Sequence, residues 1–307
     1  MRRDLRLLFG LSLLACSGTS PRETPSGATV ASATVASQNA TLERATRATR
    51  LVRPVIQPVE LVLDLDATRT LVARPMTVPE HADPPFRATV ALWESGKDAR
   101  RIPWHYDDVF IAHAALLPDS GLAVIDADGR LMQLDSPIGA PILVARHATG
   151  PIGVAPSGDR ITFLHGEMPD FELHEVARSG GSIVAVTRGL APVWCGAPGR
   201  ERGSYVFASG SGGEAATWLA RSGESPRRVP GVPFPSGLIA PDVAALGGRD
   251  VYVHESEGGI AVIDATGTPV HSVPVARAPF LHPDGTLEYA TAAGWQATML
   301  TVRASTP

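Results

Sequence analysis

The chain has 307 residues, of which 44% are hydrophobic, so it is long and apolar enough for one large domain or two ordinary ones. Its 27 Lys and Arg against 31 Asp and Glu give a net charge of −4 without a basic block. This balance argues against nucleic acid as a partner. No cofactor is expected.

The first sixteen residues resemble the signal segment of bacterial lipoproteins. A positively charged start is made by Arg2, Arg3 and Arg6. The apolar stretch 7–15 follows, and it is too short for a bilayer-spanning helix, which needs about 20 residues. Leu13-Leu14-Ala15-Cys16 resembles the lipobox. This resemblance implies cleavage after residue 15 and lipidation of Cys16, hence a stable anchor of several acyl chains.

An ordinary secretory signal with a chance cysteine is the alternative for this segment. If Cys16 is lipidated, Cys195 remains alone and no intrachain disulfide can form. Ser17, which follows in place of Asp, favours the outer membrane, with the protein facing the periplasm. Residues 16–46 contain few large apolar side chains and are interpreted as the lipidated cysteine and a flexible tether.

Short runs with β-branched and alternating character occupy the rest of the chain. Examples are VELVLDL (59–65), RATVALW (87–93), RITFLH (160–165), SYVFAS (204–209) and TMLTV (298–302). Turn residues separate the runs, and no long 3.6-residue periodicity appears. The pattern is typical of an all-β sandwich, barrel or repeat fold.

A regular series of glycines distinguishes among these folds. The series recurs every 41 to 44 residues, at Gly96, Gly139, Gly180, Gly223 and Gly267. This spacing matches the period of about 40–45 residues of four-stranded propeller blades. Each glycine is predicted to lie in the hairpin before the last strand of its blade, where a positive φ suits glycine.

A second set of turns lies earlier in each unit, as in LPDSG (117–121), APSGD (155–159) and HPDGT (282–286). APSGDRITF (155–163), ARSGG (177–181) and VAVT (184–187) together resemble the TolB-type propeller repeat. The resemblance implies a six-bladed β-propeller of four-stranded antiparallel blades over residues 47–303. The alternative is two β-domains with a break near residue 150.

The expected blades span approximately 59–104, 109–146, 151–187, 191–230, 236–274 and 277–303, followed by a tail at 304–307. The sixth unit is one strand short. An N-terminal strand from residues 49–58 is predicted to complete it and to remove the exposed edges of an open ring.

No nucleophile elbow, zinc-helix motif, phosphate loop or dinucleotide fingerprint is present. The chemically densest stretch is Trp104-His105-Tyr106-Asp107-Asp108, interpreted as an inter-blade loop at one face of the ring. His105, Asp107 and Asp108 there are candidate partner or metal contacts; alternatively, the aromatic residues cover the core and the polar ones face water.

Four further residues are expected on the first strands of blades, near the central channel: His113, Cys195, Asp242 and His282. A converging His and Asp could bind a cation or exchange protons, although polar residues also line watery channels without such a role. Cys195 is expected to be buried rather than nucleophilic.

Two functions follow as expectations. The first is an envelope-anchored lipoprotein whose propeller is a non-catalytic scaffold for envelope proteins, as the resemblance to TolB implies. The second is a small-ligand-binding or metal-dependent, lactonase-like hydrolytic propeller with its site at the channel mouth. The sequence leaves the oligomeric state and the identity of the partner open.

Overall fold

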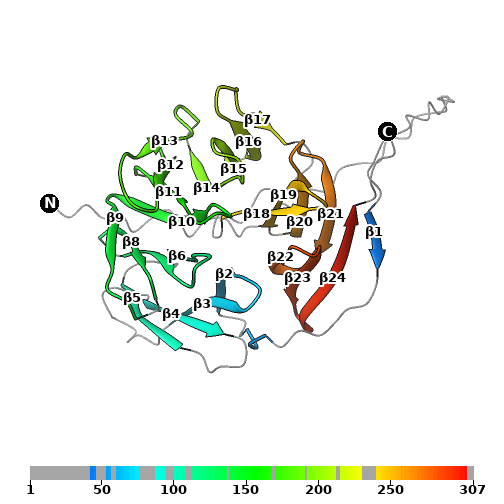
Figure 1. Ribbon diagram of the computed structural model, residues 1–307, viewed down its shortest axis with the longest axis horizontal. Helices are drawn as coiled ribbons and strands as arrows, with labels where there is room; N and C mark the ends of the chain where they lie inside the picture. Colours follow the sequence, from blue (N-terminus) through cyan, green and yellow to red (C-terminus); the bar gives the residue numbers. More distant parts are fainter. Residues whose placement is uncertain are drawn as a thin grey trace, which may run out of the picture. The chain divides into compact units, whose positions relative to one another are not determined.

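The computed structural model describes residues 42–45, 53–56, 60–75, 87–94, 100–107, 113–126, 128–136, 138–167, 170–190, 192–211, 215–229, 240–256 and 258–302. These residues form six four-stranded antiparallel sheets arranged as a β-propeller (Figure 1). The predicted fold class is therefore confirmed. Within the described ranges, no helix is long and apolar enough to cross a membrane.

In blades 1 to 5, the strands follow one another from the centre outwards. Blade 1 contains β2 (Leu61–Leu65), β3 (Arg69–Pro75), β4 (Arg87–Glu94) and β5 (Arg100–Asp107). Blade 2 contains β6 (His113–Leu116), β7 (Leu122–Ile125), β8 (Leu131–Leu134) and β9 (Ile142–Ala145). Blade 3 contains β10 (Ala148–Val154), β11 (Arg160–His165), β12 (Glu172–Ala177) and β13 (Val184–Ala185).

Blade 4 contains β14 (Val193–Pro198), β15 (Ser204–Ser209), β16 (Ala216–Arg221) and β17 (Arg227–Arg228). Blade 5 contains β18 (Asp242–Leu246), β19 (Arg249–Ser256), β20 (Gly259–Asp264) and β21 (Pro269–Pro274). Blade 6 contains β22 (Arg277–Leu281), β23 (Thr286–Thr291), β24 (Gly294–Val302) and, outermost, β1 (Leu42–Ala45).

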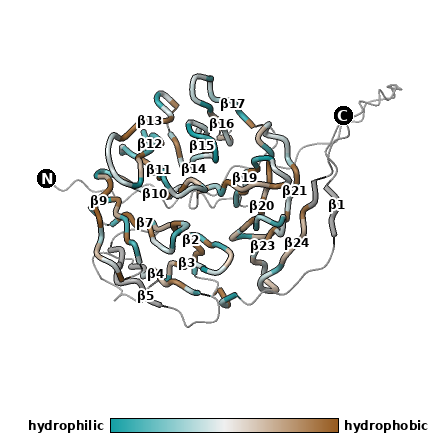
Figure 2. Tube along the Cα trace, viewed as in Figure 1, coloured by the Kyte–Doolittle hydropathy of each residue, from teal (hydrophilic) through white to brown (hydrophobic). Residues whose placement is uncertain are grey.

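The hydrophobic core is divided among the seams between blades. Side chains alternate along each strand, so successive residues face opposite neighbours. In β7, Leu122 and Val124 pack towards blade 1, whereas Ala123 and Ile125 pack towards blade 3. Each of the six seams has its own buried cluster, and hydrophobic residues are accordingly spread over the blades (Figure 2).

The seam between blades 2 and 3 excludes the two-domain alternative. Its cluster includes Ala115 and Leu131 on one side of residue 150 and Phe163 and Val176 on the other. Both Leu131 and Phe163 are fully buried there. A boundary between independent domains near residue 150 would cut through this cluster.

The turn glycines do not all share one backbone conformation. Gly180 and Gly223 each have φ of 82°, in the hairpins that lead to the outermost strands of blades 3 and 4. This left-handed conformation strongly favours glycine. Gly139 does not have the predicted positive φ; a Cβ atom there would meet Ser136 in a tight contact, 3.1 Å from its hydroxyl oxygen. Gly96 lies outside the described residues.

The strand that completes blade 6 is β1, which pairs with β24 from Leu42↔Val302 to Ala45↔Met299. An N-terminal strand therefore closes the ring, but residues 49–58 do not supply it as predicted. Pro54 and Pro58 lack the amide hydrogens that a regular ladder needs, which makes 49–58 a poor strand. The predicted tether, 16–46, consequently ends in a strand of the propeller.

The segment 53–56 fastens blade 6 to blade 1 through side chains. The Arg53 guanidinium donates hydrogen bonds to both carboxylate oxygens of Glu288 on β23. It also donates to the carbonyl oxygens of Asp66 and Arg69 and to the Thr70 hydroxyl, at 2.5, 2.9 and 3.0 Å. We call these five residues the Arg53 latch.

The ion pair of the latch is almost completely withdrawn from solvent. The side chains of Arg53 and Glu288 are only 6% and 2% exposed. The Trp295 indole nitrogen donates to the Pro54 carbonyl at 2.8 Å, and the guanidinium lies over the Trp295 ring, 5.7 Å from its centroid. The segment that was expected to pair as a strand thus contributes to ring closure through one buried ion pair.

Candidate functional site

A cavity of about 630 Å³ lies where the innermost strands converge. Residues of β2, β6, β10, β18 and β22 line it, together with the turns that follow four of these strands, Ala240 and Pro241 before β18, and the two arginines Arg69 and Arg200. Most of the wall is apolar, contributed by Leu63, Leu116, Ile152, Ala244, Phe280 and Leu281. A concave, mainly apolar space with a few polar groups is typical of ligand sites.

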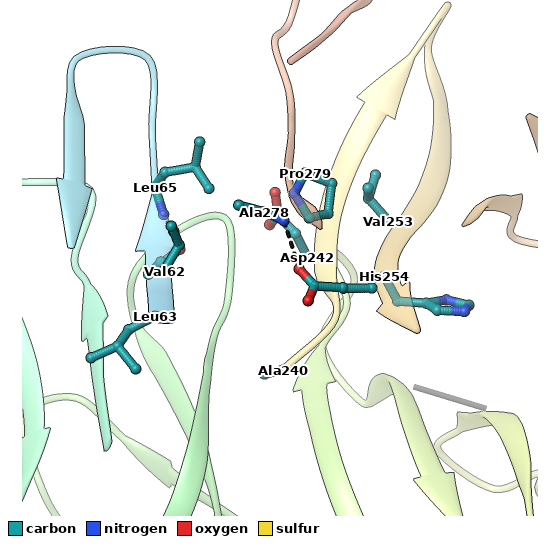
Figure 3. A pocket seen from close by; sticks show the side chains of 11 residues that line it. Val62, Leu63, Leu65, Ala240, Asp242, Val253, His254, Ala278 and Pro279 are labelled. Atoms are coloured by element: carbon teal, nitrogen blue, oxygen red, sulfur yellow. Dashed lines mark hydrogen bonds between the residues drawn. The ribbon is translucent and has the colours of Figure 1, made fainter. Parts of the chain in front are cut away.

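Asp64 and Asp242 belong to the walls of both this cavity and a smaller one of about 30 Å³ beside it. The smaller space is large enough for about one water molecule. Figure 3 shows it between Val62, Leu63 and Leu65 of β2 on one side and Asp242, Ala278 and Pro279 on the other. The two aspartates therefore approach one site from blades 1 and 5.

A β-bulge positions Asp64. The register between β2 and β3 shifts between Val62 and Asp64, so the regular alternation of the strand is interrupted there. Such bulges re-aim side chains. The Asp64 carboxylate accepts hydrogen bonds from the backbone amides of Leu116 in blade 2, at 2.7 Å, and of Leu65, at 2.8 Å.

Burial, helped by the negative charges of Asp242 and Asp66, raises the pKa of Asp64 to about 7. The two backbone hydrogen bonds act in the opposite direction but are outweighed. Near neutral pH, Asp64 is thus divided between its charged and neutral forms. It can accept hydrogen bonds in either form and donate one when protonated.

Asp242 begins β18, and its Oδ1 atom accepts a hydrogen bond from the Val243 amide at 2.8 Å. Burial raises the pKa of Asp242 as well. Glu255 of β19 also lines the smaller cavity and accepts a hydrogen bond from the Ala278 amide at 2.6 Å. Burial raises its pKa, although the Ala278 hydrogen bond and the charge of Arg277 oppose the shift.

Beside Asp64 and Asp242 the wall favours a positively charged ligand group with an apolar body, whereas Arg69 and Arg200 place positive charge on other parts of the same wall. A cation next to Asp64 and Asp242 would stabilise both ionised forms and lower both pKa values. Apolar walls would remove the ligand from water and strengthen that attraction. Within the described residues, no three His, Cys, Asp or Glu side chains are placed together to hold a metal ion.

Of the four residues expected near the channel, Asp242 lines the cavity. His113 starts β6, but its ring lies against Gly150 of β10, where a Cβ atom would come within 2.2 Å of the ring. Burial lowers the pKa of His113 to about 4. Cys195 on β14 is fully buried, and burial raises the pKa of its thiol to about 12.

His282 and the aromatic stretch in blade 1 lie elsewhere. His282 follows β22 and approaches Glu288 of the Arg53 latch, with its Nε2 atom 2.9 Å from Oε2. Trp104 to Asp107 form the end of β5, the outermost strand of blade 1, so His105 and Asp107 do not belong to a channel loop as expected. The pairing of His105 with Thr89 and of Tyr106 with Ala88 extends the strand through this stretch. Cys16 and Asp108 lie outside the described residues.

Sequence reasoning missed Asp64 and Glu255. Asp64 lies within the apolar run VELVLDL, where a carboxylate in a first strand is itself a signal of a channel group. The bulge that redirects its side chain arises from pairing with β3. The alternation of apolar and polar residues along β2 does not reveal it. Glu255 lies on a second strand, β19, and lines the smaller cavity.

No protein-family model and no curated protein sequence matches this chain. Among solved structures, TolB from Acinetobacter baumannii is similar, with 15% identity and a TM-score of 0.51 over 76% of this chain. A gluconolactonase from Xanthomonas campestris has 13% identity and a TM-score of 0.50, covering 84% of this chain and 99% of that one. The match covers 64% of the TolB chain, slightly less than two thirds of its length. At these identities, the likeness establishes a shared propeller fold.

Proposed function

We propose that this chain is a non-catalytic binding propeller of the bacterial cell envelope, anchored through lipidated Cys16. The channel mouth receives a positively charged side chain of a protein partner. The observation that carries this proposal is the cavity of about 630 Å³ with Asp64 and Asp242 on its wall. The lipobox-like start of the chain and the TolB-like fold support the location in the envelope.

The location is tested by substitution of the lipid acceptor. Cys16→Ser should release the protein into the soluble periplasm or leave an unprocessed precursor. Fractionation with the membranes and gel migration identical to the parent would contradict the lipid anchor. The orientation towards the periplasm is tested by protease accessibility in intact and in permeabilised cells.

The partner site is tested by substitution of the channel carboxylates. A partner captured by the anchored parent at a fixed stoichiometry should be lost when Asp64→Asn and Asp242→Asn are combined. Exposed Asp128, which lies in the turn between β7 and β8, provides a matched control, and Asp128→Asn should retain the partner. Equal capture by all three proteins would place the partner elsewhere.

A second candidate function is a small-ligand-binding or hydrolytic propeller with the same cavity. The acid pair with raised pKa values favours it, and one similar structure is described as a gluconolactonase. Elemental analysis and lactone hydrolysis test this candidate. Bound metal or hydrolysis that is lost in Asp242→Ala and kept in His113→Ala would support this candidate over the scaffold. Of these two residues, Asp242 lines the cavity and His113 does not.

A further inference from the structure

Exposed apolar side chains gather on the rim of two neighbouring blades. Seven large hydrophobic side chains are exposed in the part of the chain that the structure describes, and five of them lie next to or on β9 and β13. They are Ile138, Ile142 and Leu143 of blade 2 and Ile183 and Val184 of blade 3. We call these five residues the apolar rim. Figure 1 places β9 and β13 on the outside of adjacent blades.

The apolar rim coincides with open sheet edges. Among the residues that the structure describes, β9 and β13 are the outermost strands of their sheets and pair on one side only, with β8 and β12. The other side of such a strand presents backbone amides and carbonyls that can pair with another strand. Ile142 and Leu143 are 52% and 45% exposed, so one edge offers both hydrogen-bonding groups and apolar surface.

The outer strands of the other blades are protected against pairing. β17 consists of exposed Arg227 and Arg228, and β21 begins and ends with the exposed prolines Pro269 and Pro274. The sequence places charged residues in the remaining two, Arg100-Arg101 in β5 and Glu43-Arg44 in β1. Charge and proline are the usual means of blocking edge-to-edge association. β9 and β13 contain neither within the strand, and one exposed proline, Pro141, directly precedes β9.

The two segments that carry the rim contain arginine but no acidic residue, although the whole chain is acidic and exposed Asp128 and Asp135 lie on the turns before and after β8. Residues 137–147 and 179–190 contain no Asp or Glu, and exposed Arg146 and Arg188 follow β9 and β13. A segment with acidic residues beside an apolar strand would complement both features. A second copy of this chain, with its own arginines at the same positions, would bring like charges together.

We propose that the apolar rim is a docking surface for an extended, apolar segment of a partner protein that carries acidic residues. The segment adds to blade 2 as a fifth strand beside β9, and its acidic residues face Arg146. Backbone pairing gives affinity in this mode, and alternate side chains give selectivity. This surface is separate from the channel, so it stands whether or not the proposed function of the channel is correct.

The test uses two synthetic nine-residue peptides of alternating valine and threonine, one flanked by glutamates and one by lysines. Each is titrated into the full chain, and hydrogen exchange of the β9 and β17 amides is followed by mass spectrometry. We expect the glutamate peptide to bind and to slow exchange in β9 but not in β17. The lysine peptide should bind at least about tenfold more weakly.

Substitutions of exposed residues distinguish specific binding at the apolar rim from nonspecific hydrophobic binding. Ile142→Lys combined with Leu143→Lys should weaken the glutamate peptide about tenfold or more, which corresponds to a typical interface anchor. Val275 is 84% exposed and lies between blades 5 and 6, so Val275→Lys is the matched control and should bind normally.

Three results would overturn the proposal. The first is an absence of β9 protection by the glutamate peptide. The second is equal binding of the two peptides or of the parent and the double variant. The third is a concentration-dependent dimer in sedimentation that the double variant abolishes, because it would assign the rim to a second copy of the chain.

Discussion

Replacement of Arg53 by alanine should destabilise the whole propeller, although the substitution lies outside every strand. Arg53→Ala leaves the Glu288 carboxylate, whose side chain is 2% exposed, without its guanidinium partner and with the His282 ring nitrogen still 2.9 Å from Oε2. Removal of one member of a buried ion pair costs about 3–5 kcal/mol. The variant also removes the hydrogen bonds to Asp66, Arg69 and Thr70, which join blade 1 to the latch.

The expected loss of unfolding free energy is therefore at least about 3 kcal/mol. Since 1 kcal/mol shifts the Tm of a domain of this size by about 2–4 °C, the Tm should fall by roughly 10 °C. Thermal and urea unfolding, followed by circular dichroism on the full chain, provide the measurement. Arg188→Ala, an exposed arginine between blades 3 and 4, is the control and should change stability by less than about 0.5 kcal/mol.

A double variant tests the electrostatic reasoning itself. Arg53→Met combined with Glu288→Leu removes both buried charges, so it should recover much of the stability that Arg53→Ala loses. A loss below about 1 kcal/mol for Arg53→Ala would refute the latch as a closing element. A double variant as unstable as the single one would show that the hydrogen bonds to blade 1, rather than the unpaired carboxylate, carry the effect.

Further predictions concern pH and packing. Burial lowers the pKa of His113 to about 4, so the folded protein loses stability as the pH falls from 6.5 towards 4. Urea unfolding at pH 7 and at pH 4.5 measures this loss. The loss should be smaller in His113→Gln than in the parent, by up to about 3 kcal/mol. The pH dependence caused by Asp64 has the opposite sign. Its pKa is raised to about 7, so the parent loses stability as the pH rises from 5 to 8, and the unfolding free energy of Asp64→Asn should gain about 2–3 kcal/mol relative to the parent over that range. A constant difference between the two proteins across that range would contradict the assignment. Gly153→Ala would place a Cβ atom 2.4 Å from the Gly196 carbonyl oxygen and 2.5 Å from the Thr162 hydroxyl, at the seam between blades 3 and 4. The variant should lose about 1–3 kcal/mol of unfolding free energy in urea. Gly181→Ala meets no atom within 4 Å, so it tests the cost of a left-handed φ alone.

The sequence permits prediction of the architecture because the features that define blades are local. A glycine such as Gly180 or Gly223 marks its hairpin by its own backbone requirement, and the recurrence of that hairpin reveals the ring. The alternation along β7 likewise follows from the period of two residues in any strand. These properties can be read without knowledge of the pairing partner.

The closing strand and half of the acid pair depend on partners far away in the chain. Both 42–45 and 49–58 are adjacent to the propeller in sequence, and the choice between them depends on which one fits the free edge of β24. Asp64 reaches the channel because of a bulge against β3, which local alternation does not reveal. The stretch from Trp104 to Asp107 combines residues that favour turns with residues that favour strands, so its sequence is compatible with both. Its pairing with β4 makes it a strand.

The position of β1 determines how this molecule responds to tension. Leu42 lies opposite Val302, so the two ends of the chain leave blade 6 from the same end of the β1–β24 pair. A force applied between these ends acts across the β1–β24 pair from one end. It therefore separates the four residue pairs one after another, rather than all at once in shear. The buried guanidinium of Arg53 comes next along the chain, so mechanical opening should proceed in two steps, a weak one at β1 and a stronger one at the joint between blades 6 and 1.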